Sequence, residues 1–358
     1  MSTNKQKAIT PCLTIHYVAD HSGCGAIRTI FPNDILNSTY GQSKKYEGIV
    51  SSRFFIDQNL LANAKVIRFQ RQITNDQLKF IELIRQIRDK NNLPYKIIYD
   101  VDDLYTNVPN YNAASKFYNQ PFIKENVSKV VNLVDIFTVT TYELKKEIET
   151  FKGTCKVKVI PNYVPKYIYR PTKEIIKKEN NKPTVLWAGS ATHFSLHDQG
   201  DFSLILDLIK NTTKEFDWLI MGISKDHIPY WFKDIAPKVK IINWMRSIQS
   251  FPSFLKELNA DFGLAPLLNN PFNKCKSNIK CLDYASADIL SICSNIVTYK
   301  DDSKVFLQDD WKEDRDQIID IFQNKQKKEE IINKQNKMLD KYYLETKGIS
   351  KYKELFGF

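Results

Sequence analysis

The stretch that most constrains the fold lies at residues 261–295. Residues 262–266 form an apolar run that ends at a proline, as a buried strand does. Ser277 is a suitable N-cap, and the apolar positions behind it have helical spacing. A second apolar run follows at residues 289–293. Two buried strands joined by a helix predict a βαβ unit of a parallel sheet.

The polar loop of this unit brings lysines to the start of its helix. A helix N-terminus attracts anions, and lysines add point charges there. We therefore predict a site for a phosphorylated ligand, formed by Lys276, Ser277, Asn278 and Lys280. Asp283 follows within the helix, where it can accept hydrogen bonds from sugar hydroxyls. The alternative is an ordinary α/β crossover with solvated lysines.

The chain of 358 residues is long enough for two domains of ordinary size. A polar, charged segment at about 170–183 is a candidate linker. Strand–glycine–helix patterns occur on both sides of it, which is typical of two Rossmann-like α/β domains. We predict the first over residues 1–170 and the second over 182–325.

The run from Phe272 to Asn295 resembles the nucleotide-sugar-binding segment of GT-B-fold glycosyltransferases, in the large retaining group of the "group 1" type. In that group a helix N-terminus binds the donor diphosphate and an acidic residue binds the ribose hydroxyls. Asp283 stands where these enzymes usually have Glu, and Cys275 stands where they have another Glu. The resemblance implies two domains that face each other across a cleft, with C-terminal helices (residues 326–358) that cross back to the first domain.

The first domain begins with an apolar strand at residues 11–20 and a turn that contains Gly23 and Gly25. Such a turn lets a ligand approach the backbone, but a GxG pattern without a third glycine is a weak dinucleotide signature. An NAD(P)-linked enzyme is therefore disfavoured. GT-B enzymes commonly have a glycine turn here, so the resemblance implies Gly25 as a donor-site residue. We predict Arg28, one turn into the helix, at the donor site as well, where it can face the donor phosphates or the acceptor. The alternative for Arg28 is a surface arginine.

A predicted buried strand at residues 96–103 ends in Asp100, Asp102 and Asp103. The carboxyl ends of parallel strands are where open α/β sheets bind ligands. One hypothesis is a DxD signature that binds a divalent metal and a nucleotide-sugar diphosphate, as in GT-A enzymes. We favour acids that handle the acceptor hydroxyl, because the predicted phosphate site lies in the other half of the chain. A helix N-cap with surface acids is the third interpretation.

The second domain has a turn at Gly189 and Ser190 after an apolar strand, followed by His193. This pattern resembles one in part of the family, which implies an acid/base or phosphate-binding role for His193. A surface histidine is the alternative. Many retaining members have an Arg and a Lys near this loop, whereas this loop has neither. Arg246, Lys276 or Lys280 must then supply the positive charge.

These patterns predict a glycosyltransferase that moves a sugar from a nucleotide sugar, expected to be a UDP-sugar, to an acceptor hydroxyl with retention. No further cofactor and no metal is required, because helix dipole and lysines can stabilise the diphosphate. The predicted catalytic residues are Asp100, Asp102, Asp103 and His193. A protein of the same fold that binds a nucleotide sugar or nucleic acid without catalysis is the alternative of another class.

The charge distribution bears on the acceptor. The net charge is +11, and the first 165 residues hold 22 Lys and Arg against 15 Asp and Glu. A basic first domain attracts phosphate-rich partners. We therefore predict DNA as the acceptor, at a hydroxymethylated pyrimidine as in phage genomes, which would have to be flipped out of the duplex. The alternative acceptor is a cell-envelope polysaccharide or a lipid-linked glycan.

The composition indicates a globular protein, because 42% of the residues are hydrophobic and 12% aromatic. The sequence contains no apolar run long enough for a transmembrane helix, and its N-terminus lacks the apolar centre of a signal peptide. Its six cysteines form no CxxC pair, which favours free thiols. We therefore expect a cytoplasmic protein, in the host cytoplasm if a phage encodes it. The sequence does not determine the oligomeric state.

Overall fold

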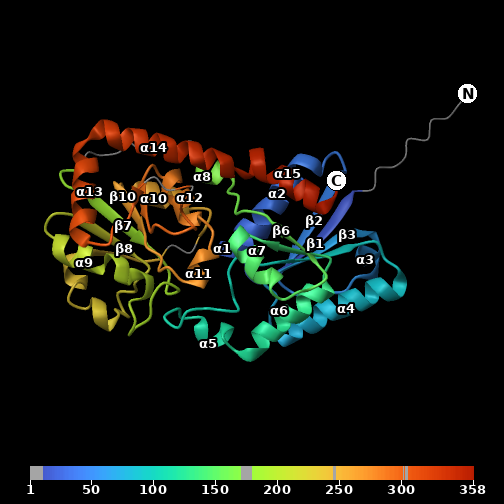
Figure 1. Ribbon diagram of the computed structural model, residues 1–358. Coiled ribbons are helices and arrows are strands. Elements are labelled where there is room, and N and C mark those ends of the chain that lie inside the picture. The colour runs from blue at the N-terminus through green and yellow to red at the C-terminus, as the bar shows by residue number, and fades with distance from the viewer. Residues whose placement is uncertain (1–10, 171–179, 245–246, 301, 303–304) are drawn as a thin grey trace, which may run out of the picture. The chain divides into compact units, whose positions relative to one another are not determined.

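The computed structural model describes residues 11–170, 180–244, 247–300, 302 and 305–358. The chain divides into two compact units, each built on a six-stranded parallel sheet with helices around it (Figure 1). Unit 1 comprises the chain up to Asp102, Phe122–Tyr163 and Leu344–Phe358, and unit 2 comprises Asp103–Pro121 and Val164–Tyr343. The predicted α/β class with two Rossmann-like sheets is confirmed.

The sheet of unit 1 has the strand order β2-β1-β3-β4-β5-β6. Its central strands are buried because helices cover both faces of the sheet; all seven residues of β1, for example, are buried. The strands are β1 (Cys12–Val18), β2 (Tyr46–Ser51), β3 (Ala64–Gln70), β4 (Lys96–Asp100), β5 (Ile136–Val139) and β6 (Lys156–Val159). The helices are α1 (Gly23–Gly25), η1 (Ala26–Ile30), α2 (Phe31–Tyr40), α3 (Gln58–Asn63), α4 (Asn75–Asn91), α6 (Pro121–Leu133), α7 (Tyr142–Glu149), η6 (Leu344–Gly348) and α15 (Ile349–Phe356).

Side-chain direction along the strands of unit 1 separates an aromatic face from a polar one. Tyr17 and Phe69 stack on one face and contact Phe80 of α4. His16 and Arg68 point to the opposite face, which α15 covers (Figure 1). Helix α4 forms at its position because Thr74 and Gln77 make a reciprocal capping box at its start.

Unit 2 has the strand order β12-β11-β10-β7-β8-β9. Its strands are β7 (Thr184–Ala188), β8 (Asp217–Met221), β9 (Lys240–Ile242), β10 (Phe262–Ala265), β11 (Leu290–Cys293) and β12 (Val305–Phe306). Its helices are α5 (Ser115–Tyr118), α8 (Lys166–Tyr169), η2 (Gly200–Phe202), α9 (Ser203–Thr212), η3 (Tyr230–Phe232), η4 (Ala236–Lys238), α10 (Phe251–Glu257), α11 (Pro271–Lys274), α12 (Ile279–Ser286), α13 (Trp311–Gln323), α14 (Lys325–Leu339) and η5 (Asp340–Tyr342).

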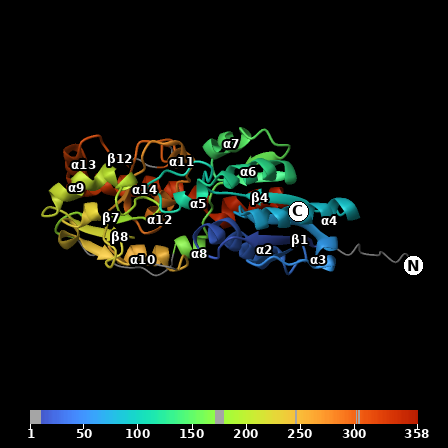
Figure 2. The same ribbon diagram turned by 90° about the horizontal axis from the view of Figure 1, so that it is seen from below.

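The predicted βαβ unit is present as β10, α12 and β11, with β10 and β11 adjacent and parallel. Helices α9 and α13 share a hydrophobic core with Trp187 and Leu264 on one face of the sheet (Figure 2). On the other face the ring of Tyr284 in α12 lies against Gly263, where any side chain would collide with it. The sheet thus holds α12 close to the end of β7.

The division into units differs in two places from the domains that we predicted. Residues 103–121 follow β4 in sequence but belong to unit 2. Helix α14 contacts α12 and β11 of unit 2, and only the chain from Leu344 onward belongs to unit 1. Most of the candidate linker, residues 171–179, lies outside the described residues. Within the described part of the chain, no helix has the length and apolarity needed to cross a membrane.

Candidate functional site

The start of helix α12 is the centre of the candidate site in unit 2. The N-cap is Asn278 and not Ser277 as predicted, because the Asn278 carbonyl accepts the first helical bonds, from Cys281 N and Leu282 N; its side chain donates to Asp302 Oδ2 (2.7 Å). The Asn278 side chain makes no capping bond to the helix. Since the first N–H groups of any helix have no partner within it, this end can donate to an anion.

Lys280 joins this helix to the end of strand β7. Its ammonium group donates to the carbonyl oxygen of Ala188, the last residue of that strand. Burial lowers the pKa of Lys280 to about 8; Asp283 opposes this shift and Lys276 adds to it. Lys280 is therefore largely charged at neutral pH, but its charge is poorly solvated and would be stabilised by a bound anion.

A glycine follows each of the adjacent strands β7 and β8, and neither position has room for a side chain. A side chain at Gly189 would lie 2.5 Å from the Trp187 ring. Gly222 has a φ of +110°, and a Cβ there would lie 1.7 Å from the Gly189 carbonyl oxygen. Gly189 N donates to Met221 O (3.0 Å), and the hydroxyl of Ser190 pairs with that of Thr192 (2.7 Å). The packing thus brings backbone close to the Lys280 ammonium.

Asp283 lies nearly one turn after Lys280 on α12 and is half-buried. Its Oδ1 accepts a hydrogen bond from the hydroxyl of Tyr169 (2.9 Å) in α8. Burial raises the pKa of Asp283 to about 6, although Tyr169 and Lys280 act in the opposite direction. At neutral pH the group is a carboxylate with further acceptor capacity, as a hydroxyl-bearing ligand requires.

His193 is buried, which corrects the alternative of a surface histidine. Its Nδ1 lies 2.9 Å from Asp201 Oδ2. Burial is the largest cause that lowers the pKa of His193 to about 4; Asp201 opposes it, and Lys280 and Lys276 add to it. The neutral ring must carry its proton on Nδ1 to bond the carboxylate, so Nε2 carries the lone pair. His193 at neutral pH is an acceptor or base, not a cation.

Asp201 is the organising residue of this loop, and the sequence analysis missed it. Burial would raise its pKa, but hydrogen bonds, led by that from His193, hold it below its usual range. Besides His193, it accepts bonds from Tyr111 Oη (2.9 Å), Leu268 N (2.9 Å) and Asn273 Nδ2 (2.7 Å). Tyr111 and Leu268 lie in loops and Asn273 lies in the short helix α11, and no periodic sequence pattern marks these partners.

Lys276 and Asp103 meet at the same site. Lys276 Nζ lies 3.6 Å from Asp103 Oδ1 and 4.5 Å from the centre of the Phe272 ring. Both side chains are partly exposed. Lys276 and Lys280 both lower the pKa of His193 and therefore lie near it. The start of α12 is thus surrounded by two lysines, one histidine and the carboxylates of Asp103 and Asp283.

Asp100 and Arg28 belong to the core of unit 1, and their predicted roles at the reacting centre and the donor stay predictions. Both are fully buried. Asp100 accepts from Arg28 Nη2 (2.6 Å) and Thr138 Oγ1 (2.5 Å), and Arg68 Nη2 lies 2.9 Å away. Arg28 Nη1 donates to the Ile160 and Pro161 carbonyls and to Asn162 Oδ1. This ion pair thus joins η1, β4 and the segment after β6 within unit 1.

Asp102 and the glycine turn lie at the carboxyl edge of the same sheet. Asp102 Oδ1 is 3.9 Å from Arg71 Nε, and Arg71 is 3.5 Å from Asp20 Oδ2. Gly25 N donates to Asp20 Oδ1 (3.2 Å), and a Cβ at Gly25 would collide with the Asp20 carbonyl. The turn is therefore needed for backbone packing, and a donor contact through Gly25 stays a prediction.

Arg246 lies outside the described residues, so its predicted role stays a prediction. Ser277 lies beside the start of α12 and is half-buried. In the part of the chain that the structure describes, no cluster of three or more His, Cys, Asp or Glu side chains is placed to hold a metal ion.

No family model and no curated protein sequence matches the chain. Solved structures do match it. A sucrose-phosphate synthase from Thermosynechococcus elongatus has a TM-score of 0.64 at 10% identity, covering 97% of this chain and 99% of that one. A lipopolysaccharide outer core galactosyltransferase has a TM-score of 0.53 at 14% identity (96% and 99% covered). An E. coli structure described as trehalose-6-phosphate bound with UDP-2-fluoro glucose has 0.53 at 11% (92% and 77%). The chain thus has the GT-B fold.

Proposed function

We infer that this protein is a glycosyltransferase that uses a nucleotide-sugar donor. The observation that carries this proposal is the position of Lys280, whose ammonium reaches the end of β7 while Asp283 lies nearly one turn farther along α12. The free N–H groups of α12, Lys276 and Lys280 bind the diphosphate, and Asp283 accepts bonds from the ribose hydroxyls. The similar structure that holds UDP-2-fluoro glucose supports a UDP-sugar as donor.

The chemistry follows from the charge that develops when the sugar leaves. Negative charge accumulates on the diphosphate as its bond to the anomeric carbon breaks, and Lys280 with the helix end stabilises it. Neutral His193, held by Asp201, offers Nε2 as a hydrogen-bond acceptor at the same site. The group that the sequence resembles transfers sugars with retention, and we propose the same outcome here. Asp102 and Asp103 are the proposed acids near the acceptor.

Donor binding is expected to fall as the pH drops through about 6, because Asp283 then loses its charge. The experiment titrates purified protein with UDP-sugars by calorimetry across this pH range and measures release of UDP. Asp283→Asn should weaken donor binding roughly tenfold and remove the acidic limb, as expected for loss of a hydrogen bond to a charged group.

Stability supplies an independent readout for Asp283. Its pKa is raised above the ordinary value of 3.8, so its contribution to stability is greatest below that value and decreases as the pH rises through 6. Asp283→Asn should therefore leave the fold at least as stable at neutral pH while donor binding weakens. Asp207→Asn, at an exposed carboxylate of α9, is the matched control. Unchanged donor binding by Asp283→Asn, or no binding of any nucleotide sugar by the wild type, would refute the proposal.

For the acceptor we propose a hydroxymethylated pyrimidine in DNA, supported by the basic excess of the first 165 residues. A cell-envelope or lipid-linked glycan is the alternative. With the donor found by calorimetry, duplex DNA carrying hydroxymethylcytosine and a set of envelope oligosaccharides are incubated separately and analysed by mass spectrometry. A hexose-sized mass increase on DNA alone is the expected result. An increase on a glycan alone would replace this acceptor by the alternative.

A further inference from the structure

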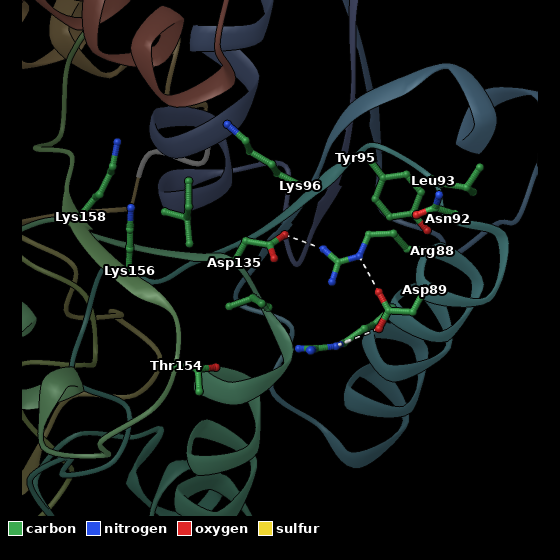
Figure 3. Close-up of a pocket in the computed structure, with 13 residues that line it drawn as sticks. Arg88, Asp89, Asn92, Leu93, Tyr95, Lys96, Asp135, Thr154, Lys156 and Lys158 are labelled. Carbon is green, nitrogen blue, oxygen red and sulfur yellow. Dashed lines mark hydrogen bonds and ion pairs between the residues drawn. The ribbon is translucent and has the colours of Figure 1, made fainter.

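An open, basic pocket of about 750 Å³ lies in unit 1, and none of the residues described for the candidate site lines it (Figure 3). It is formed where β4, β5 and β6 begin, together with the C-terminal half of α4. Asp102 follows the opposite, carboxyl end of β4. The pocket is lined by Arg85, Arg88, Asp89, Asn92, Leu93, Tyr95, Lys96, Val134, Asp135, Ile136, Thr154, Lys156 and Lys158.

The acids of this pocket are already neutralised. Asp135 Oδ2 lies 2.6 Å from Arg88 Nη1 and also accepts from Ile97 N (2.7 Å). Asp89 lies 3.0 Å from Arg88 Nε and 3.4 Å from Arg85 Nε. Figure 3 shows these ion pairs as one chain along the pocket. Two arginines and two aspartates cancel, so the remaining charge is that of the lysines.

Lys96, Lys156 and Lys158 supply this charge. Lys156 and Lys158 are two residues apart on β6, so they share a face of the sheet at a spacing of about 6–7 Å, and Figure 3 shows both side chains extending in the same direction. Lys96 shares that face on β4, two strands away. Lys156 is level with Ile98 in the register, so Lys96 is also displaced by two residues along the strand and lies about 11–12 Å from Lys156. Lys158 is 3.7 Å from Glu354, but both side chains are exposed and such a pair is weak.

We propose that this pocket binds the phosphate backbone of nucleic acid. Three ammonium groups spread over this distance do not converge on a single phosphate, but they match a ligand with phosphates in series, such as DNA with one charge per about 1.7 Å of duplex axis. Lysines act as point charges without base readout, so the contact is independent of sequence. The pocket is concave, which disfavours a flat membrane surface.

This inference deepens the acceptor proposal above, on which it rests for its biological purpose. A backbone contact at the amino end of β4 positions a polymer, and it is made by none of the residues that we propose for the reaction. Its effect on catalysis is expected in the KM for DNA and not in release of UDP from the donor. Binding of DNA is therefore measured without any donor, so failure of the pocket and failure of glycosyl transfer give different results.

The test measures binding of a fluorescent DNA duplex by anisotropy over a series of salt concentrations. The variant Lys96→Gln/Lys156→Gln/Lys158→Gln should lower the slope of log affinity against log salt by about 1 for each lysine that contacts a phosphate. The control Lys44→Gln/Lys45→Gln/Lys124→Gln removes the same charge from exposed lysines of unit 1 that do not line the pocket. It should leave the slope near that of the wild type.

Three results would overturn the proposal. Equal salt slopes for the two triple variants would show that any loss of DNA affinity comes from the change in net charge and not from the pocket. Pocket-dependent binding of anionic phosphatidylserine vesicles without binding of DNA would identify a membrane site. Competition by pyrophosphate as effective as that by DNA would identify a compact anion as the ligand. All six replaced side chains are at least partly exposed, so folding is expected to be retained and is checked by circular dichroism.

Discussion

Lys280→Ala is expected to lower kcat/KM for release of nucleoside diphosphate from the donor by about 10²–10³, the loss typical of one preorganised group at a developing charge. The reason is the position of the Lys280 ammonium, which contacts the Ala188 carbonyl beside Gly189. The loop that follows β7 contains no Lys or Arg of its own. Replacing it removes a poorly solvated charge, so stability should not fall with activity. Steady-state kinetics and a thermal melt of the same samples measure both quantities.

The pH dependence distinguishes a direct role of Lys280 from an indirect one. Burial lowers its pKa to about 8, and only the ammonium form attracts a diphosphate. Donor affinity of the wild type should therefore fall as the pH rises through about 8, and this limb should be absent in Lys280→Ala. Lys280→Arg keeps the charge in a different shape and should recover part of the affinity.

Lys274→Ala is the matched control for this position. Lys274 is an exposed lysine of α11 in the same loop, so its replacement tests the loss of charge without the loss of the contact at β7. It should stay close to the wild-type kcat/KM. A value for Lys280→Ala within twofold of that for Lys274→Ala would show that Lys280 does not bind the diphosphate.

Asp100→Ala is expected to destabilise unit 1 by about 3–5 kcal/mol, the range for removing one partner of a buried ion pair. Arg28 and Arg68 would both stay buried without their carboxylate. Chemical denaturation measures the loss in the free energy of unfolding. Hydrogen exchange of the β4 and β5 amides shows whether the loss is in unit 1. Asp76→Ala, which removes an exposed carboxylate 3.4 Å from Lys79, is the control and should have little effect.

Acid sensitivity provides a second check on Asp100. Burial alone would raise its pKa, but Arg28 and Arg68 hold it below the ordinary value of 3.8. The Asp100 carboxylate therefore stabilises the fold at pH values above its ordinary pKa. This stabilisation is lost as the pH falls through its lowered pKa in the folded protein. Asp100→Ala should thus be less stable at neutral pH but lose less on acidification. Equal stability of the variant and the wild type at neutral pH would contradict the structural role.

Local patterns predicted the architecture because they depend on periodicity and turn chemistry. Apolar runs ended by glycine or proline predicted the parallel strands, and the spacing of Lys276, Lys280 and Asp283 predicted that they gather at the start of one helix. Both features are confirmed by β10–α12–β11. The predicted start of the helix was wrong by one residue: the N-cap is Asn278 and not Ser277.

The three acids at the end of β4 show what local patterns do not contain. Asp100 pairs with Arg28 and Arg68, Asp102 lies near Arg71, and Asp103 contacts Lys276 in unit 2. Their neighbours come from positions distant along the chain. The sequence predicts that the three carboxylates lie at one strand end, but it does not indicate which of them is buried.

By itself, then, the sequence determined the two parallel sheets, the glycine turns and the lysine-bearing start of α12, since each follows from residues close in the chain. Only the tertiary structure decided that Asp100 and Arg28 are a buried pair, that His193 is neutral beside Asp201, and that Lys280 reaches the end of β7. The physical reason is that burial and hydrogen bonding set the charge of a side chain, and both depend on contacts between distant segments.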